Sequence, residues 1–129
     1  MRKSSSFELW APVVLSAGLI FIFSSFSFHY NWFQKTQKIH LDWLAHIVEY
    51  GVFGALVCRA FCAYGFFAQR AGRLFLAVML VGVLYGASDE FHQSFVPYRD
   101  SNPADVAADT VGMTLGAWIW FKKIRKENA

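Results

Sequence analysis

The sequence predicts an all-α fold: an integral membrane bundle of four transmembrane helices with both chain termini in the cytoplasm. Composition is the first reason, since 56% of the residues are hydrophobic and only 16% are charged, whereas soluble domains carry about 25% charged residues. The second reason is a series of long apolar runs, each close to the ~20 residues that a helix needs to cross a bilayer. The third is the one-sided distribution of lysine and arginine. We expect a single domain over residues 1–129.

The predicted spans are continuous apolar segments that lack the strict alternation of membrane β-strands. They cover about 9–28, 42–64, 73–95 and 103–121. The first follows a basic start, as a signal peptide would, but it is long enough to span and lacks a small-x-small cleavage site. We therefore expect it to be retained as a helix. Pro103 suits the first turn of the fourth helix, and Asn102 or Ser101 is placed to cap it.

Positive charge orients the bundle, because lysine and arginine gather on the cytoplasmic side of a membrane. With the N-terminus inside, the inner segments hold Arg2, Lys3, Arg70, Arg73, Lys122, Lys123, Arg125 and Lys126. The outer segments then hold only Lys35, Lys38 and Arg99. The net charge of +3 is thus a topology signal and does not indicate a nucleic-acid surface, so no nucleic-acid partner is expected.

Polar side chains recur at helical spacing near the outer ends of the last three spans. The second span carries Asp42, His46, Glu49 and Tyr50, the third carries Asp89, Glu90 and Gln93, and the fourth carries Asp105 and Asp109. At a rise of about 1.5 Å per residue, His46 and Glu49 lie roughly 6–10 Å inward of Asp42. A carboxylate that faces lipid would cost about 2.5–3.5 kcal/mol at mid-bilayer. We therefore expect these groups to converge on an outward-facing polar pocket.

Small residues continue two of these stripes on the inner side. Gly82 and Gly86 in the third span, and Gly112 and Gly116 in the fourth, form small-xxx-small patterns. Such patterns let two helix backbones approach closely. We expect the third and fourth spans to pack together through them.

Most of the polar residues also have a purely structural explanation. Asp42 could cap its helix, and Glu49 could simply pair with His46. Asp105 and Asp109 could stabilise a helix N-terminus, whereas Asp89 and Glu90 lie near a helix C-terminus, where the macrodipole disfavours acids. The functional interpretation assigns catalysis to Asp89, Glu90 and His46. It assigns substrate binding to Arg99, Gln93, Tyr50, Asp105, Asp109, Asp42 and Glu49.

The chain resembles the VanZ-like family, small bacterial membrane proteins named for a glycopeptide-resistance accessory. The resemblance rests on "FSSFSF" in the first span, "DWLAHIVEYGVFG" in the second and "GASDEFHQSFVPYRDSNPADVAADTVGMTLG" across the third and fourth. The chain departs from the family pattern at Trp43, where relatives often carry lysine, and at Asp109, where many carry asparagine. The resemblance implies a multi-pass protein of the bacterial inner membrane with a link to glycopeptide sensitivity, but it supplies no reaction.

Three functions fit these observations, and whether the protein is an enzyme is left open. In the first, the pocket binds or modifies an envelope lipid or glycan headgroup: Arg99 holds a phosphate or carboxylate, Asp89 or Glu90 is a general base or holds a cation, and His46 transfers protons. In the second, the protein is a non-catalytic accessory that recruits or blocks a partner. The third, a proton or cation pathway, is disfavoured because the inner halves of the spans hold no acid.

Cofactors and oligomeric state are not fixed by the sequence. Carboxylates beside histidine accept Mg²⁺, Mn²⁺ or Zn²⁺, but no fixed-spacing motif such as HExxH selects one of them. The expected partners are membrane lipids, with a lipid-linked glycan or a phospholipid as the ligand.

Overall fold

The computed structural model describes residues 5–26, 35–97, 99 and 101–127, without the side chains of residues 35–42 and 68. Over these residues the chain is helical and contains no strand, which confirms the all-α prediction for this part. The helices are α1 (Ser6–Ser24), α2 (Lys35–Cys62), α3 (Gly65–Ala68), α4 (Ala71–Gln93) and α5 (Pro103–Glu127). The expectation of a single domain over residues 1–129 stays a prediction.

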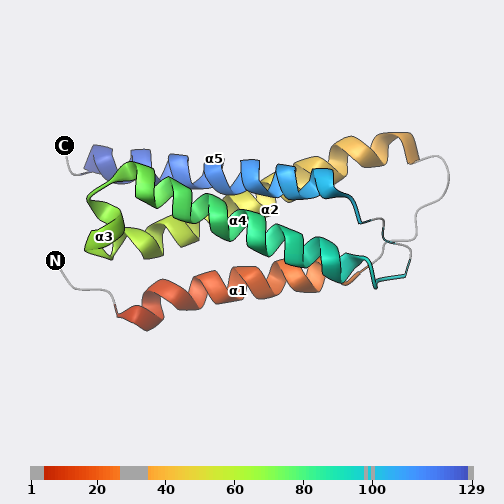
Figure 1. The fold of residues 1–129 in the computed structure, drawn as a ribbon, viewed down its shortest axis with the longest axis horizontal. Coiled ribbons are helices and arrows are strands. Elements are labelled where there is room, and N and C mark those ends of the chain that lie inside the picture. The colour runs from red at the N-terminus through yellow and green to blue at the C-terminus, as the bar shows by residue number, and fades with distance from the viewer. Residues whose placement is uncertain (1–4, 27–34, 98, 100, 128–129) are drawn as a thin grey trace.

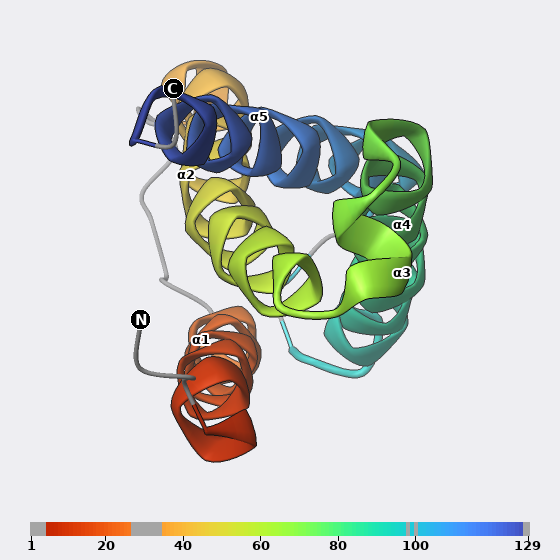
Figure 2. The same ribbon diagram turned by 90° about the vertical axis from the view of Figure 1, so that its left-hand side faces the viewer.

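The four long helices run up and down along one axis, and the short α3 lies in the connection between α2 and α4 (Figure 1). Helices α2, α4 and α5 pack on one another, whereas α1 lies against α2 and α4 on the side away from α5 (Figure 2). The α3 connection and the end of α5 are at one end of the bundle (Figure 1). The connection from α4 to α5 is at the other end, so successive long helices are antiparallel.

Local hydrogen bonds set several helix ends. Helix α1 begins at Ser6, earlier than expected, because Ser5 and Glu8 form a capping box: the Glu8 N–H donates to Ser5 Oγ at 3.2 Å and the Ser5 N–H donates to Glu8 Oε2 at 2.9 Å. Helix α5 begins at Pro103 as predicted, with Asn102 Oδ1 accepting from the Ala104 N–H at 3.1 Å. Helix α3 was not foreseen, and α5 continues past the expected residue 121 to Glu127.

By length and composition, three of the described helical segments could cross a membrane: Ser6–Ser24, Trp43–Cys62 and Ala71–Gln93. Helix α5 is not among them, because Asp105 and Asp109, together with the threonines and glycines between residues 110 and 116, lower its mean hydropathy, and basic residues follow from Lys122 onward. The expected fourth span and the cytoplasmic placement of both termini therefore stay predictions.

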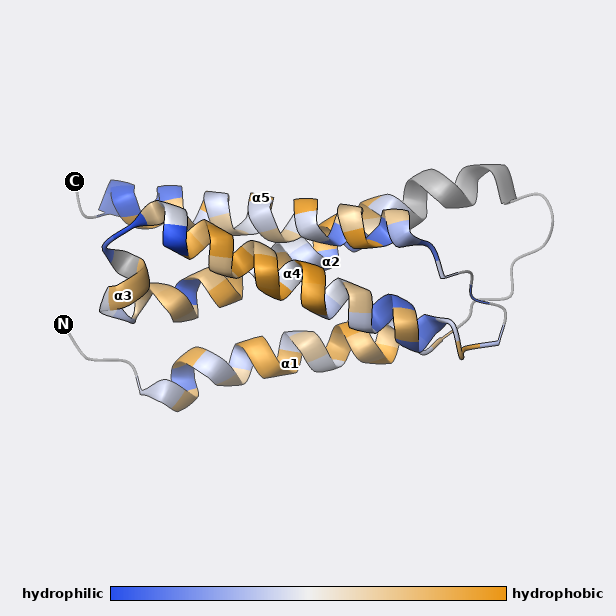
Figure 3. Ribbon diagram, viewed as in Figure 1, coloured by the Kyte–Doolittle hydropathy of each residue, from blue (hydrophilic) through white to orange (hydrophobic). Residues whose placement is uncertain are grey.

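The outer faces of all four long helices are apolar. Large exposed side chains include Leu15 on α1, Val52 on α2, Leu84 on α4 and Ile119 on α5, and Leu84 is 70% exposed. Orange residues accordingly run along the length of the helices in Figure 3. A bundle whose exterior is this apolar on every helix is suited to a lipid environment, because exposed apolar patches of this extent are rare on monomeric soluble proteins.

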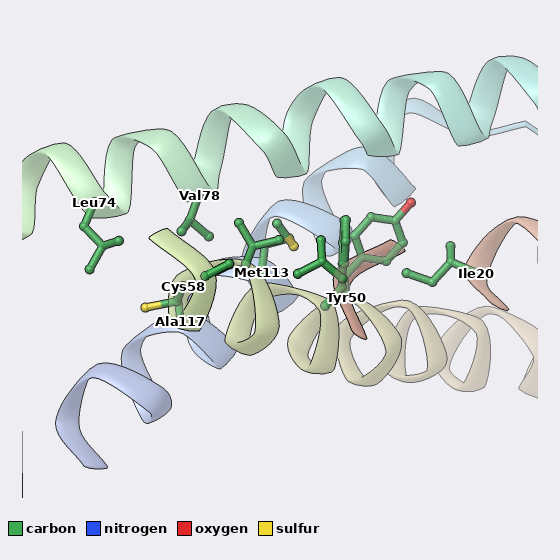
Figure 4. Close-up of a cluster of buried hydrophobic side chains, with 11 residues drawn as sticks. Ile20, Tyr50, Cys58, Leu74, Val78, Met113 and Ala117 are labelled. Carbon is green, nitrogen blue, oxygen red and sulfur yellow. The ribbon is translucent and has the colours of Figure 1, made fainter. Parts of the chain in front are cut away.

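The interior between α2, α4 and α5 is an apolar core. In Figure 4, Leu74 and Val78 of α4, Cys58 of α2 and Met113 of α5 lie along the bundle, followed by Tyr50 of α2 and then Ile20 of α1. Helix α1 adds Val13 and Ile20 to this core from the side.

Glycines let α5 approach α2 as well as α4, so α5 has one more close neighbour than the sequence indicated. A Cβ on Gly112 would lie 2.6 Å from the backbone oxygen of Ile47, and one on Gly116 would collide with the backbone oxygen of Gly51. The α5 glycines therefore face α2, whereas the α4 glycines face α5: a Cβ on Gly82 would lie 3.0 Å from the Met113 side chain. The predicted packing of the third and fourth spans is confirmed, and Gly86 faces Asp109, where a Cβ would lie 2.8 Å from Oδ2.

Candidate functional site

Polar side chains from α2, α4 and α5 meet at the end of the bundle that carries the connection from α4 to α5. Figure 3 shows hydrophilic residues at the C-terminal end of α4 and at the start of α5, close to this connection. Hydrogen bonds and electrostatic interactions connect the members into one network, which we call the polar cluster. Its members are His46, Glu49, Tyr50, Asp89, Glu90, Gln93, Arg99, Asp105 and Asp109.

The contact between His46 and Asp109 joins α2 to α5. His46 Nδ1 donates to Asp109 Oδ1 at 2.8 Å, and the side chains are 12% and 0% exposed respectively. Helix geometry explains the placement: Asp109 precedes Gly112 by three residues, so it shares the α5 face that lies against α2. Because Nδ1 is engaged, the ring is held in one orientation and Nε2 is the nitrogen left for other chemistry.

Helix α4 contributes two buried acids, which point to different neighbours. Asp89 Oδ2 accepts from Gln93 Nε2 at 2.9 Å, one helical turn further along the same face. Glu90 Oε2 accepts from the backbone N–H of Asn102 at 2.7 Å. Glu90 thereby ties the end of α4 to the residue that caps α5, and it interacts electrostatically with Asp105 and His46.

Glu49, Tyr50 and Arg99 complete the polar cluster. Glu49 is half-buried and interacts electrostatically with His46, Asp89, Arg99 and Asp109. Tyr50 is fully buried on the same helix, and its ring stacks on His46 at a centroid distance of 6.4 Å. Arg99 is half-buried in the connection between α4 and α5 and brings positive charge to the acids.

The structure therefore brings together every residue that the sequence singled out, with one exception. The side chain of Asp42 lies outside the described residues, so its suggested role as a cap or a ligand stays a prediction. The division of the other residues into catalytic and substrate-binding sets also stays a prediction.

Several buried polar atoms of the polar cluster have no hydrogen-bond partner among the described residues. They are the Tyr50 hydroxyl, Arg99 Nε and four carboxylate oxygens, namely Asp89 Oδ1, Glu90 Oε1, Asp105 Oδ1 and Asp109 Oδ2. Burial of such groups without a partner is unfavourable. The concentration of these atoms at one end of the bundle indicates that they meet a ligand, an ion or water.

Three potential metal ligands lie together within the polar cluster. His46, Glu90 and Asp105 each offer one ligand atom, and these three atoms lie within 4.8 Å of one another. The three residues come from three different helices, so their proximity is a product of the tertiary fold. Imidazole and carboxylate are both common ligands of divalent cations in proteins.

Sequence reasoning missed two contributors near the polar cluster. The Asn102 N–H, treated only as part of a helix cap, fixes Glu90. Tyr85 packs its ring at 6.1 Å from that of Tyr50 and donates its hydroxyl to the backbone oxygen of Ala17 at 2.6 Å, which links α4 to α1. Tyr85 falls four residues before Asp89 on the same helical face, and that spacing was the available signal.

Comparison with known proteins adds one finding. The family model described as VanZ/LLP1 matches residues 9–125, which include every member of the polar cluster. Neither the curated proteins nor the solved structures provide a match.

Proposed function

The chain belongs to the VanZ/LLP1 family, and from that premise we propose that its polar cluster binds the headgroup of a membrane lipid or lipid-linked glycan in the cell envelope. Membership and the three apolar helices make it a multi-pass membrane protein, and the family supports an accessory role. The proposal adds the ligand, the site that binds it and the side of the membrane on which that site opens.

The observation that carries the proposal is the set of buried carboxylate oxygens that lack partners within the described structure. An ionised carboxylate only accepts hydrogen bonds. A ligand that satisfies Asp89 Oδ1 and Asp109 Oδ2 must therefore bring hydroxyl or ammonium donors. Sugar and glycerol headgroups are rich in hydroxyls, and they are located at the depth at which a cluster near the helix ends would meet them.

Arg99 supplies the opposite charge. Its guanidinium matches the geometry of a phosphate or carboxylate and forms strong charge-assisted hydrogen bonds. We assign the phosphate of the headgroup to Arg99 and the hydroxyls to the acids, with Gln93 and Tyr50 beside Asp89 to orient them. His46, held by Asp109, keeps Nε2 available to accept a proton or to hold a cation.

Helix α5 is part of the proposal as a fourth span. Asp109 in the middle of the helix faces the bundle, since it is fully buried, and the outward face carries Val111, Leu115 and Ile119 as exposed side chains. The free-energy cost of placing an acid in the membrane is lower when the acid is shielded from lipid in this way than when it faces lipid. With four spans, the bias of lysine and arginine places both termini in the cytoplasm and the polar cluster on the outer side of a bacterial inner membrane.

A proton or cation pathway has less support. Beyond Tyr50 the described interior is filled by Val57, Val78, Leu74 and Met113. These side chains offer no polar group to continue a path toward the other end of the bundle. The headgroup proposal needs no such continuation.

Lipid binding by the full chain tests the proposal. We expect native mass spectrometry of the protein from nanodiscs to show that wild type retains an isoprenoid phosphate, phosphatidylglycerol or a glycosylated diacylglycerol in preference to phosphatidylcholine. Asp89→Asn and Arg99→Gln should each weaken that binding by about tenfold or more, which corresponds to ~1.4 kcal/mol. Arg73→Gln, an exposed arginine at the other end of the bundle, is the matched control.

The same experiment separates the alternatives. Retention that is equal for wild type, Asp89→Asn and Arg99→Gln would contradict the proposal and favour an accessory that acts through a protein partner. A change with time in the mass of the retained lipid would show that the protein modifies the lipid as well as binding it.

A further inference from the structure

We propose that His46, Glu90 and Asp105 bind a divalent transition-metal cation, Zn²⁺ or Mn²⁺, and that Asp109 orients the histidine ligand. This site does not require the headgroup proposal, because a cation can occupy it in the absence of any lipid ligand.

The geometry of the three side chains supports a shared cation. At metal–ligand distances of about 2.1 Å, two ligands of one ion lie at most ~4.2 Å apart. The ligand atoms of His46, Glu90 and Asp105 all lie within 4.8 Å of one another, so a small rotation of the side chains brings them into coordination. They extend from α2, α4 and α5, so the packed bundle holds them together.

The unpartnered oxygens are an independent observation that indicates a ligand. Glu90 is only 5% exposed; its Oε2 accepts from the Asn102 N–H at 2.7 Å, and its Oε1 has no partner within the described ranges. Asp105 Oδ1 is likewise buried without a described partner. Carboxylates that approach this closely repel one another when both are ionised. A divalent cation removes the repulsion and satisfies both oxygens.

Asp109 provides the support that metal-binding histidines usually have. A histidine ligand almost always donates its other ring N–H to a carboxylate, a carbonyl or water, which fixes its tautomer and orientation. His46 Nδ1 donates to Asp109 Oδ1 at 2.8 Å. Asp109 is fully buried, so this contact is protected, and it leaves Nε2 as the ring nitrogen that would bind the cation.

The ligand set narrows the choice of metal. Imidazole suits Zn²⁺ and carboxylate suits Mn²⁺, while Mg²⁺ usually keeps several waters and is bound through carboxylates and phosphates. Three protein ligands leave at least one position open to water or to a ligand oxygen, as in catalytic zinc sites. Where a phosphate headgroup also binds, the open position is where its oxygen would reach the cation, beside Arg99.

Metal titration of the full-length protein in phosphatidylcholine nanodiscs tests this site without any candidate headgroup. After chelation and dialysis, Zn²⁺ and Mn²⁺ are titrated separately, with calorimetry for affinity and elemental analysis for stoichiometry. We expect wild type to bind one equivalent of metal. Glu90→Gln and Asp105→Asn should each weaken the binding by about tenfold or more. The matched control Glu127→Gln makes the same chemical change on an exposed acid at the opposite end of the bundle and should bind as wild type does.

A second measurement does not depend on the folding of the acid variants. The electron paramagnetic resonance spectrum of Mn²⁺ bound to wild type with ¹⁵N-labelled histidine should show one nitrogen coupling, and His46→Gln should abolish it. The site is refuted if wild type binds no stoichiometric metal above empty nanodiscs, if Glu90→Gln, Asp105→Asn and the control Glu127→Gln all bind alike, or if the nitrogen coupling is missing or survives in His46→Gln. Failure here leaves headgroup retention to be judged by its own experiment.

Discussion

Among single residues, Asp109 does most to connect the helices around the polar cluster. It lies on α5, it is fully buried, and its two oxygens face different neighbours. Oδ1 accepts from His46 on α2 at 2.8 Å, and Oδ2 lies where a Cβ on Gly86 of α4 would approach to 2.8 Å. Gly86 thus leaves room for a carboxylate. An asparagine at this position would keep the size and an oxygen acceptor but would lose the charge.

The contact between His46 and Asp109 should contribute to stability. We expect His46→Ala to lower the free energy of unfolding by about 1–3 kcal/mol, because it leaves a buried carboxylate without its donor. Loss of ellipticity at 222 nm on heating in detergent measures the change. The double variant His46→Ala, Asp109→Ala should be less destabilised than the sum of the single variants. Additive effects would show that the two side chains do not interact.

Substitution of Tyr50 should affect ligand binding without lowering stability. Its ring is fully buried in the core, and its hydroxyl lies near the Asp109 carboxylate without reaching full hydrogen-bond geometry within the described chain. Tyr50→Phe keeps the ring and removes an unsatisfied group, so the melting temperature should stay the same or rise. Retention of the headgroup lipid should fall in the same variant. A marked loss of stability would mean that the hydroxyl is satisfied in the membrane by a group of the protein itself.

For the helices as units, the decisive contact is the close approach of α2 and α5. Gly112 and Gly116 of α5 lie against the backbone of α2 at Ile47 and Gly51. This contact places Asp109 beside His46. Asp109 lies on the same face of α5 as Gly112 and Gly116, and His46 directly precedes Ile47 on α2. The polar cluster therefore depends on glycines that carry no chemistry.

Enlarging these glycines should separate the helices. Gly112→Ala places a Cβ 2.6 Å from the Ile47 backbone oxygen, and we expect a loss of about 1–3 kcal/mol, as for other overpacked interiors. Gly18→Ala on α1, where nothing lies within 4 Å of the new Cβ, is the control and should be neutral or slightly stabilising. Thermal unfolding in detergent compares the two. Equal stability of both variants would contradict the close approach of α2 and α5.

Much of this architecture could be predicted from the pattern of residues. Apolar runs indicated the long helices, and the spacing of His46, Asp89 and Asp109 indicated that their side chains would share one region. The partner of Gly112 and Gly116 could not be predicted, because a small-xxx-small stripe shows that a helix is approached closely but not by which neighbour. The bond from the Asn102 N–H to Glu90 depends on how the connection folds, which the composition of that connection does not specify.

On the scale of the whole molecule, the account requires the polar cluster to open outward and α5 to cross the membrane. The cluster lies at the end of the bundle opposite the α3 connection and the end of α5 (Figures 1 and 3). The basic residues from Lys122 to Lys126 are at that opposite end. The basic residues lie in the cytoplasm and Arg99 lies outside only if the protein has four spans and both termini are cytoplasmic.

Labelling of single cysteines in intact cells tests this topology. With Cys58 and Cys62 replaced by alanine, an impermeant maleimide should label Ser101→Cys in the connection between α4 and α5. Gln69→Cys and Glu127→Cys should react only after the cells are permeabilised; all three native side chains are exposed. Labelling of both Ser101→Cys and Glu127→Cys from outside would show that α5 does not cross. If Ser101→Cys is protected while Gln69→Cys and Glu127→Cys are labelled from outside, the orientation is the opposite of the one proposed.

The central claim is that side chains of α2, α4 and α5 form one polar cluster when the protein is in a bilayer. Solid-state NMR of the ¹³C,¹⁵N-labelled full chain in lipid bilayers tests it most directly, through correlations from the His46 ring to the carboxyl carbons of Asp109, Glu90 and Asp105. We predict a strong correlation between His46 Nδ1 and the Asp109 carboxyl carbon and weaker ones to Glu90 and Asp105. Assigned signals for all four residues with no correlation between His46 and any of the three acids would contradict the account.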